Sequence, residues 1–272
     1  MSLPATGDAQ GISLAARFST GPQLFAPDEA RRRLADWLSE LPSYQARALQ
    51  DIAANHPQAG VILEGIAEFS PFLFDLMRAD AARVIALLES DPDAHLSALI
   101  ARTVRDTAAN ADEADIMRFL RRMKSEAALL IALCDIGGVW PVMRVTRALT
   151  DIAEASVQCA VRYLLAQEVS RGRLLAPVPA KPEQGSGLIV FAMGKMGAGE
   201  LNYSSDIDLI VYYDRERPKL AADVEPSPFF VRIAQGLSRI LQQRTADGYV
   251  FRVDLRLRPD PASTPVAIST AA

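Results

Sequence analysis

The sequence LIVFAMGKMGAGELNYSSDIDLIVYY, residues 188–213, decides the fold expected for this chain. It begins with the apolar run Leu188–Ala192, which is typical of a short buried strand. A glycine-rich turn follows, with Gly194, Gly197 and Gly199. Glycines let a backbone approach an anion closely, and successive amides can form an anion-binding nest. A second apolar segment, Ile207–Tyr213, completes the pattern, so we expect two strands joined by a phosphate-binding turn.

Two acidic residues open the second of these strands. Side chains on a strand alternate between its two faces, so Asp206 and Asp208 are expected to project the same way. The residues expected to point into the core are Ile207, Leu209 and Val211. Two carboxylates two residues apart can share metal ions, and hard oxygen ligands suit Mg²⁺.

A third aspartate lies in the stretch FRVDLRLR, residues 251–258. Apolar and charged residues alternate along it, which predicts a strand with one dry face and one charged face. Asp254 would complete a carboxylate triad able to hold two metal ions around a phosphoryl centre. The arginines of the charged face, which can clamp phosphate oxygens, are Arg252, Arg256 and Arg258. The alternative is an exposed strand whose charges pair with one another.

One helix is expected between the second and third strands. Ser227 is predicted to be its N-cap and Pro228 its first residue, and Asp247-Gly248 ends the segment. The order of strand, glycine turn, strand, helix and strand predicts a compact α/β palm. Its glycine turn and three carboxylates favour a site for nucleotidyl transfer.

The first part of the chain is predicted to be helical. The expected helices cover residues 28–41, a segment running from residue 71 through residue 88, residues 112–136, and a segment from residue 141 to near residue 172. Residues 176–187 have the composition of a linker. The expected fold class is therefore α+β, with a helical domain over residues 1–175, a linker over 176–187, and a palm with a small mixed sheet over 188–272.

Composition favours a globular protein of the cytoplasm. The 272 residues are 50% hydrophobic, enough to bury a sizeable core. A net charge of -4 and a pI near 5.4 give no basic footprint for bulk nucleic-acid binding. Residues Met1–Asp8 lack the features of a signal peptide, and no apolar run reaches membrane-spanning length. We therefore expect neither nucleic acid nor a membrane among the partners.

The cysteines and histidines are expected to have no part in catalysis. Cys134 and Cys159 are predicted to be free thiols buried in helices. His56 and His95 have no Cys, Asp or Glu cluster at zinc spacing around them. The chain also lacks the G-x-x-x-x-G-K-[ST] motif of a Walker-type ATPase.

Two further groups of residues are given structural interpretations. The basic run Arg121, Arg122 and Lys124 is expected on a solvated helix face, although it could instead point toward the cleft or a partner. The aromatic residues expected in the core rather than on a recognition surface are Phe69, Phe72 and Phe74.

The motifs resemble those of a known family. Gly194-Lys195, ten further residues and then Asp206-Ile207-Asp208 resemble the signature of the polymerase-β-like nucleotidyltransferase superfamily. Within it, residues 194–209 and 253–259 look like the glutamine synthetase adenylyltransferase/adenylyl-removing enzymes. Residues 201–206 and the helical region that precedes the core look like the first, adenylyl-removing half of these enzymes. Lys195 stands where the superfamily often has serine. Because the family's enzymes continue into a second core, the palm is expected to be truncated at its C-terminus.

The resemblance implies a Mg²⁺-dependent transferase that regulates nitrogen metabolism. Inorganic phosphate would remove AMP from a tyrosine of glutamine synthetase and release ADP. The implied catalytic and metal-binding residues are Asp206, Asp208 and Asp254. The implied contacts to the phosphates of ATP or ADP are Gly194, Lys195, Gly197, Ser205 and Arg256. The implied protein partners are glutamine synthetase and the PII signalling protein.

Two alternatives remain open. The same core could transfer AMP forward, from ATP to glutamine synthetase. It could also be an inactive fragment that binds a nucleotide or a partner without turnover.

Overall fold

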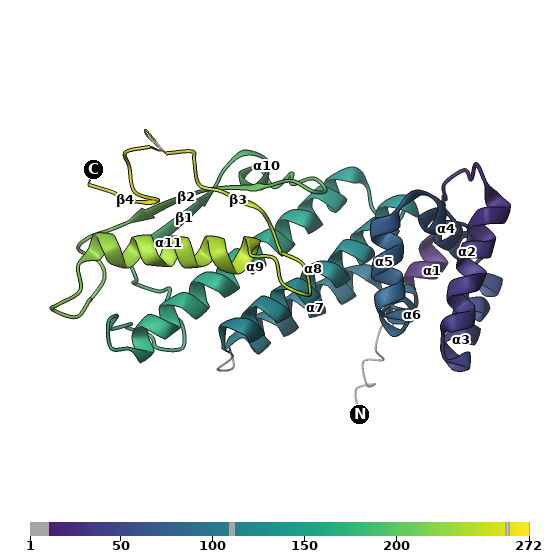
Figure 1. The fold of residues 1–272 in the computed structure, drawn as a ribbon, viewed down its shortest axis with the longest axis horizontal. Helices are drawn as coiled ribbons and strands as arrows, with labels where there is room; N and C mark the ends of the chain where they lie inside the picture. Colours follow the sequence, from purple (N-terminus) through teal and green to yellow (C-terminus); the bar gives the residue numbers. More distant parts are fainter. Residues whose placement is uncertain (1–10, 109–111, 259, 261, 272) are drawn as a thin grey trace, which may run out of the picture. The chain divides into compact units, whose positions relative to one another are not determined.

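A computed structural model describes residues 11–271, except 109–111, 259 and 261. Helices and a small mixed sheet make up the described chain, which confirms the predicted α+β class (Figure 1). Met1–Asp8, considered above for a signal peptide, lie outside the described residues. No helix of the described part is both long and apolar enough to cross a membrane.

The chain divides into two compact units. The first is Met1–Leu99 with Ser125–Val145, and the second is Ile100–Lys124 with Thr146–Ala272. The second unit thus holds the sheet together with helical residues that precede it. The domain boundary at residues 176–187 stays a prediction.

Among the described residues of the first unit, helices alone form the regular structure. Those lying wholly within it are α1 (Leu14–Arg17), α2 (Pro27–Glu40), α3 (Ser43–Asn55), α4 (Pro57–Phe69), α5 (Pro71–Ala79) and α6 (Ala81–Glu89). Parts of α7 (Pro92–Ala108), α8 (Glu113–Ile136) and α9 (Val142–Ser170) also belong to it. The helices expected over 28–41, 112–136 and 141–172 are therefore confirmed as α2, α8 and α9.

The expected continuous helix through residues 71–88 is two helices. Asp80 interrupts it with an extended backbone, at φ -159°, and its Oδ1 accepts a hydrogen bond of 3.0 Å from the backbone N of Arg83. An aspartate that caps a new helix in this way satisfies an amide that has no partner within the helix.

The prediction of a core position is correct for Phe74 and wrong for its two neighbours. Phe74 is 7% exposed and packs edge-on against Trp37, whereas Phe69 is 45% and Phe72 61% exposed. The amphipathic helices α4 and α5 bury one stripe each, and these two rings lie outside those stripes.

The second unit contains a sheet of four strands around β2. These are β1 (Leu188–Ala192), β2 (Ile207–Tyr213), β3 (Val253–Asp254) and β4 (Ala267–Ser269). β1 pairs antiparallel to β2, while β3 and β4 both run parallel to it. β3 pairs with the beginning of β2 and β4 with its end, so the two occupy successive positions along β2. β4 was not expected from the sequence.

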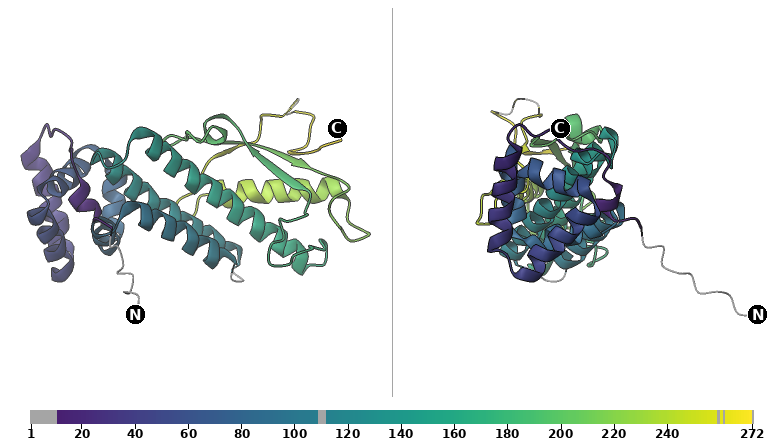
Figure 2. Two further views of the ribbon diagram at one scale, coloured as in Figure 1. Left: turned by 180° about the vertical axis from the view of Figure 1, so that it is seen from behind. Right: turned by 90° about the vertical axis from the view of Figure 1, so that its right-hand side faces the viewer.

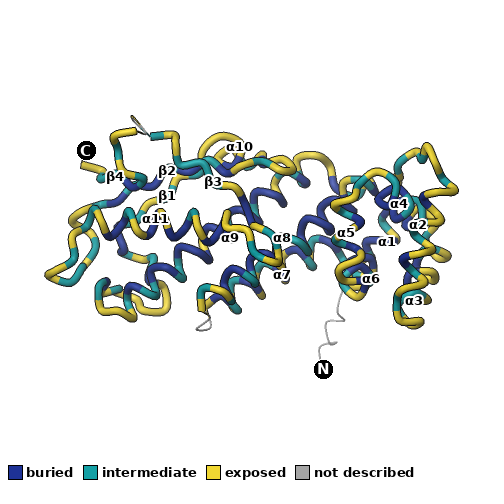
Figure 3. The backbone as a smooth tube through the Cα atoms, in the orientation of Figure 1, coloured by how far each residue is buried: buried dark blue, intermediate teal, exposed yellow. Residues whose placement is uncertain are grey.

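Helices α9 and α11 (Pro226–Gln242) lie on the same side of the sheet in Figures 1 and 2. Tyr213 at the end of β2 stacks on Phe230 of α11, with ring centroids 4.7 Å apart. Val157 of α9 and Val190 of β1 line one cavity of about 520 Å³. In Figure 3, α11 alternates between buried and exposed colours, as expected of a helix that buries one face.

The strand predicted over residues 188–192 is confirmed, but the prediction that this strand is buried on both faces is wrong. Ile189 is 37% and Phe191 52% exposed, whereas the residues that alternate with them, Leu188, Val190 and Ala192, are half-buried and line a cavity together with residues of α9. The reason is that the described helices cover one face of β1 only. Phe191 instead packs edge-on against Tyr212 of β2 on the opposite face, with ring centroids 5.9 Å apart.

The third predicted strand is much shorter than its sequence pattern. Only Val253–Asp254 form a ladder, and Leu257 is 48% exposed. After Asp254 the backbone bonds locally: the N of Arg256 donates to Asp254 Oδ1 at 2.8 Å, and the N of Arg258 donates to the carbonyl O of Arg256 at 2.7 Å. Local bonds of this kind compete with a sheet ladder for the same backbone groups.

The helix preceding β3 also differs at its ends from the prediction. α11 begins at Pro226, with Glu225 rather than Ser227 as N-cap, and it ends at Gln242. Gly248, expected to mark the helix end, lies in a turn that follows, with φ +85°. Either proline suits the first turn of a helix, so the sequence does not choose between them.

Arg121 contradicts the solvated helix face predicted for the basic run. Its side chain is buried, with 1% of the residue exposed, whereas Arg122 is exposed as expected. The cysteines agree with the prediction: Cys134 and Cys159 are free and buried in α8 and α9.

Candidate active site

The three predicted carboxylates lie in the part of the sheet where β2 and β3 begin to pair. Asp208 of β2 lies directly opposite Asp254 of β3 in the parallel ladder. Asp206 immediately precedes β2, two residues from Asp208 and therefore on the same face. Ile207 between them is fully buried, as the alternation predicts. The short helix α10 (Gly194–Gly197) contacts β2 at this end of the sheet (Figure 1).

The glycine turn brings backbone close to Asp208. Gly194 has φ +54°, and a Cβ atom at this position would lie 2.8 Å from Asp208 Oδ2. The backbone N of Met193 also donates to the carbonyl O of Asp208 at 2.8 Å. At Gly197, a Cβ would lie 2.4 Å from the carbonyl O of Ala192. A side chain larger than glycine would crowd both positions: at Gly194 it would collide with the Asp208 carboxylate, and at Gly197 with the backbone at the end of β1.

Arginines neutralise two of the three carboxylates. Arg252 Nε donates to Asp206 Oδ1, and Arg252 Nη2 reaches the carbonyl O of Ser204 at 3.0 Å. Arg256 forms a fork on Asp254, with Nη2 to Oδ2 at 2.6 Å and Nε to Oδ1 at 3.0 Å. The side-chain hydrogen bond from Arg256 lowers the pKa of Asp254 and so favours its ionised form. For Asp254, the structure thus has the charge pairing that was the alternative interpretation of this strand.

The donor set fits a hard divalent cation. All three side chains offer carboxylate oxygens, the ligands that Mg²⁺ prefers. Among the described residues, no three His, Cys, Asp or Glu side chains gather closely enough to hold a metal ion. In the structure, Asp206 and Asp254 are instead paired with Arg252 and Arg256. Arg252 and Arg256 have side chains 59% and 81% exposed, and exposed ion pairs contribute only about 0–1 kcal/mol, so a cation can displace them.

The remaining predicted residues are less closely tied to the carboxylates. Lys195 is exposed on α10. Ser205 Oγ donates to Asn202 Oδ1, which fixes the turn before Asp206. Arg258 turns away, because its Nε donates to the carbonyl O of Thr264 at 3.1 Å. Lys195 and Ser205 therefore remain predicted phosphate contacts, while Arg258 buttresses the following turn.

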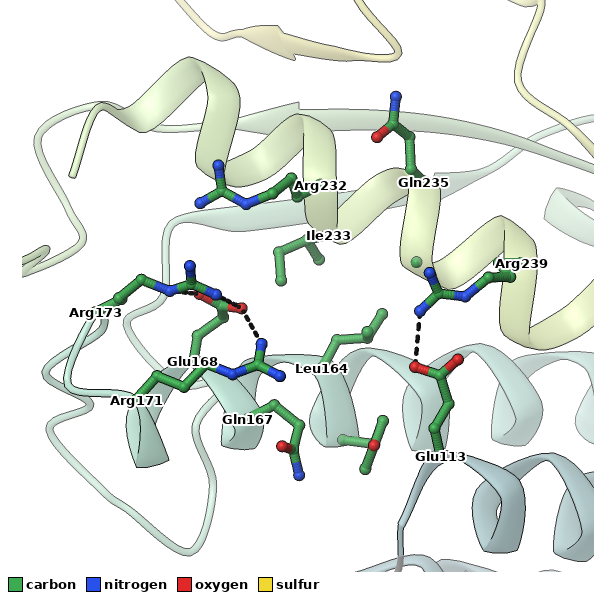
Figure 4. Close-up of a pocket in the computed structure, with 12 residues that line it drawn as sticks. Glu113, Leu164, Gln167, Glu168, Arg171, Arg173, Arg232, Ile233, Gln235 and Arg239 are labelled. Atoms are coloured by element: carbon green, nitrogen blue, oxygen red, sulfur yellow. Dashed lines mark hydrogen bonds and ion pairs between the residues drawn. The ribbon is translucent and has the colours of Figure 1, made fainter.

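A separate arginine-rich pocket lies between α9 and α11. It has a volume of about 270 Å³, and Glu168 pairs with Arg171 at 3.2 Å and with Arg173 at 2.6 Å. Figure 4 shows Glu168 between these two arginines, with Arg232 facing them from α11. None of the predicted site residues lines this pocket, so the carboxylate cluster is a distinct site.

Sequence analysis missed the contribution of Arg121 to this part of the molecule. Its guanidinium donates to backbone carbonyls on the segment that leads into β3. A signal was present: Arg121 falls four residues after Met117 and one after Leu120, on the apolar stripe of its helix. A charged residue on such a stripe is buried only when partners satisfy it.

Comparisons with known proteins give the family of the chain. The sequence model described as "Glutamate-ammonia ligase adenylyltransferase" matches residues 62–272. A bifunctional glutamine synthetase adenylyltransferase/adenylyl-removing enzyme of Rhodopseudomonas palustris (strain BisB5) is 65% identical over 263 residues, 97% of this chain and 27% of the relative. Proteins of the same name from Bradyrhizobium diazoefficiens and Xanthobacter autotrophicus are 63% and 52% identical, over 98% and 96% of this chain and 27% and 26% of their own lengths.

The chain thus spans about a quarter of the length of the curated relatives it matches, at 27% for the first of them. The family match covers residues 62–272, which include the whole of the sheet and all three carboxylates. The chain belongs to the glutamate-ammonia ligase adenylyltransferase family.

Proposed function

We propose that this chain carries a nucleotidyltransferase core that controls glutamine synthetase, by phosphorolytic removal of AMP from a synthetase tyrosine. The observation that carries the proposal is the pairing of Asp208 with Asp254 on adjacent strands, with Asp206 two residues away and the glycine turn alongside. Family membership supports the control of glutamine synthetase by adenylylation. The removal direction rests on the resemblance of residues 201–206 and of the preceding helical region to the adenylyl-removing half of such enzymes.

The reaction exchanges one phosphate ester for a phosphoanhydride. An oxygen of inorganic phosphate attacks the α-phosphorus of the tyrosyl-AMP ester and forms the new P–O bond of ADP. The bond between that phosphorus and the tyrosine oxygen breaks, and the tyrosine oxygen takes a proton. Bound Mg²⁺ supplies neutralisation of the charge that spreads over the phosphoryl oxygens. Asp206, Asp208 and Asp254 would hold it.

The chain's other groups would position the phosphates. Arg252 and Arg256, once displaced from their aspartates, present planar donors that suit phosphate oxygens. The turn from Gly194 to Gly197 leaves room for phosphate oxygens against the backbone. Lys195 adds a mobile positive charge. These fixed donors and charges stabilise a loose, charge-spread transition state without reorganising during the reaction.

The proposed partners follow from the same reaction. They are adenylylated glutamine synthetase, inorganic phosphate and an adenine nucleotide, with the PII protein as a regulator and the cytoplasm as the compartment. Direct binding of PII to this chain can be tested by titration calorimetry.

The test uses the purified chain, adenylylated glutamine synthetase, phosphate and Mg²⁺, with ADP release measured by chromatography. We expect release by the wild type and loss of at least about 100-fold in Asp208→Asn, because the carboxylate charge acts on the developing phosphoryl charge. Glu216→Gln is the matched control, since Glu216 is an exposed acid elsewhere in the same unit.

The alternatives predict different products. Incorporation of labelled AMP from ATP into unmodified synthetase, without ADP release, would favour forward transfer. Nucleotide binding without turnover in either assay would identify a binding fragment. ADP release by Asp208→Asn at the wild-type rate would overturn the role of the carboxylates.

A further inference from the structure

The strand that carries Asp254 has a short hydrogen-bonded ladder. β3 contains two residues, whereas strands usually have about five or six. Its ladder with β2 includes a bond of 2.9 Å from the N of Ile207 to the carbonyl O of Arg252. Beyond Asp254 the backbone bonds to itself, as described above. The position of Asp254 therefore depends on the chain that leads into β3, residues 243–251.

Arg121 of α8 holds the start of that leading segment. Its Nε donates to the carbonyl O of Gly248 at 2.8 Å, and its Nη2 donates to that of Gln243. Its Nη1 is shared between the carbonyl oxygens of Met117, at 2.8 Å, and Ile240, at 3.2 Å. The carbonyl groups at a helix C-terminus have no partners within the helix. Arg121 thus joins the last turn of α11 to the turn that follows it.

Lys124, one helical turn later, holds the end of the same segment. Its Nζ lies 4.3 Å from the ring centroid of Phe251 and 3.5 Å from the carbonyl O of Val250. Val250 and Phe251 are buried, and the backbone N of each donates to the carbonyl O of Leu241 at the end of α11. Phe251 precedes Asp254 by three residues, so its anchor limits where Asp254 can lie.

We propose that Arg121 and Lys124 form a clasp that positions Asp254 opposite Asp208. Neither side chain is a catalytic residue, since both act through backbone and ring contacts with residues 240–251. The clasp rests on the proposed function for its effect on turnover, but its effect on the chain leading into β3 follows from the contacts alone. Arg121 and Lys124 thus control the geometry of a carboxylate that they do not themselves touch.

The experiment compares Arg121→Met with Arg122→Gln in the 272-residue chain. Methionine keeps the apolar stem but removes the donors to Gln243 and Gly248, whereas Arg122 is exposed on the same helix. Amide hydrogen exchange of residues 249–256 is measured without substrate. We expect the exchange rate of these amides to rise about tenfold or more in Arg121→Met, because the segment opens locally. The exchange rates of amides in β2 and α9 should stay unchanged.

Turnover supplies the second measurement. In Arg121→Met, kcat for ADP release should fall by about 100-fold, the effect of a misplacement near 1 Å. KM for adenylylated synthetase should stay within about twofold, because Arg121 is buried, with 1% of the residue exposed, and a purely positioning role affects the step after binding. Lys124→Met, which is nearly isosteric, should show the same pattern more weakly. It replaces Arg121→Met as the test if that variant does not fold.

The outcomes separate the clasp from the proposed function. A wild type that releases no ADP refutes the proposed function, while hydrogen exchange still decides the clasp. Unchanged exchange over 249–256 in folded Arg121→Met overturns the clasp. So does a loss of kcat that merely follows the folded fraction, or a rise in KM at constant kcat, because each indicates a role other than positioning.

Discussion

Replacing Gly194 with alanine places a methyl group against a proposed metal-binding carboxylate. A Cβ at this position would lie 2.8 Å from Asp208 Oδ2. Non-bonded heavy atoms prefer separations of about 3.5 Å or more, so the carboxylate must move by roughly 0.7 Å. Asp208 cannot relax freely, because its backbone is fixed in the ladder between β1 and β3. Its side chain must therefore rotate away from the position that faces Asp254.

Gly194→Ala should have two separate effects, one on stability and one on turnover. Gly194 has φ +54°, and a left-handed backbone costs a residue with a Cβ about 1–2 kcal/mol of stability. The second part is catalytic, since a misplacement near 1 Å can reduce turnover by about 100-fold. A shift of roughly 0.7 Å should therefore reduce kcat for ADP release by about 10- to 100-fold, or about 1.4–2.7 kcal/mol in the activation barrier.

Gly172→Ala is the matched control for backbone strain. Gly172 has φ +69°, and no heavy atom of the described residues would contact its Cβ within 4 Å. Urea unfolding should give similar losses of stability for both variants, while only Gly194→Ala should lose turnover at saturating substrate. Equal kcat values for the two folded variants would refute the reasoning, because the contact with Asp208 would then have no catalytic consequence.

Three further predictions concern stability and reactivity. Burial lowers the pKa of Lys124 from 10.5 to about 8, so between these pH values the unfolded chain binds a proton that the folded chain has released. Unfolding free energy should therefore rise with pH in this window, by up to about 3 kcal/mol, and Lys124→Met should lack this rise in urea titrations at pH 7.5 and 10. Phe74→Ala should cost about 3–5 kcal/mol in the same assay, while Phe72→Ala, at a site 61% exposed, should cost under about 0.5 kcal/mol. Cys134 and Cys159 are buried and burial raises the pKa of both thiols, so a thiol-specific reagent at pH 8 should modify them only after urea unfolds the chain.

The parts of the fold that were predictable depend on local patterns. Alternation in residues 207–213 is a direct consequence of strand geometry, and the structure follows it at every position. The helical segment expected from residue 71 begins there, as α5, because the Ser70 cap and the first-turn Pro71 act within one turn. In residues 251–258 the same alternation predicted a long strand and failed. The backbone there finds partners in its own side chains, which a period of two does not reveal.

The candidate site could be predicted only in part, because its geometry depends on contacts between residues far apart in the sequence. The pattern could place Asp206 and Asp208 on one face, but the meeting of Asp208 with Asp254 depends on the parallel register of two distant segments. The burial of Arg121 likewise depends on carbonyl groups about 120 residues away, at Ile240 and Gln243. Helix periodicity could mark its position as inward-facing, yet it could not name the partners that make a buried guanidinium stable.

β3 and β4 pair with different parts of β2, so the sheet need not open as one unit. They occupy successive positions along β2. β3 carries Asp254 and pairs with the beginning of β2, whereas β4 pairs with Val211–Tyr213 at its end. Each of the two has its own ladder with β2, and the ladder of β3 is only two residues long. The part of the sheet that carries Asp254 can therefore open locally while β4 stays paired with the end of β2.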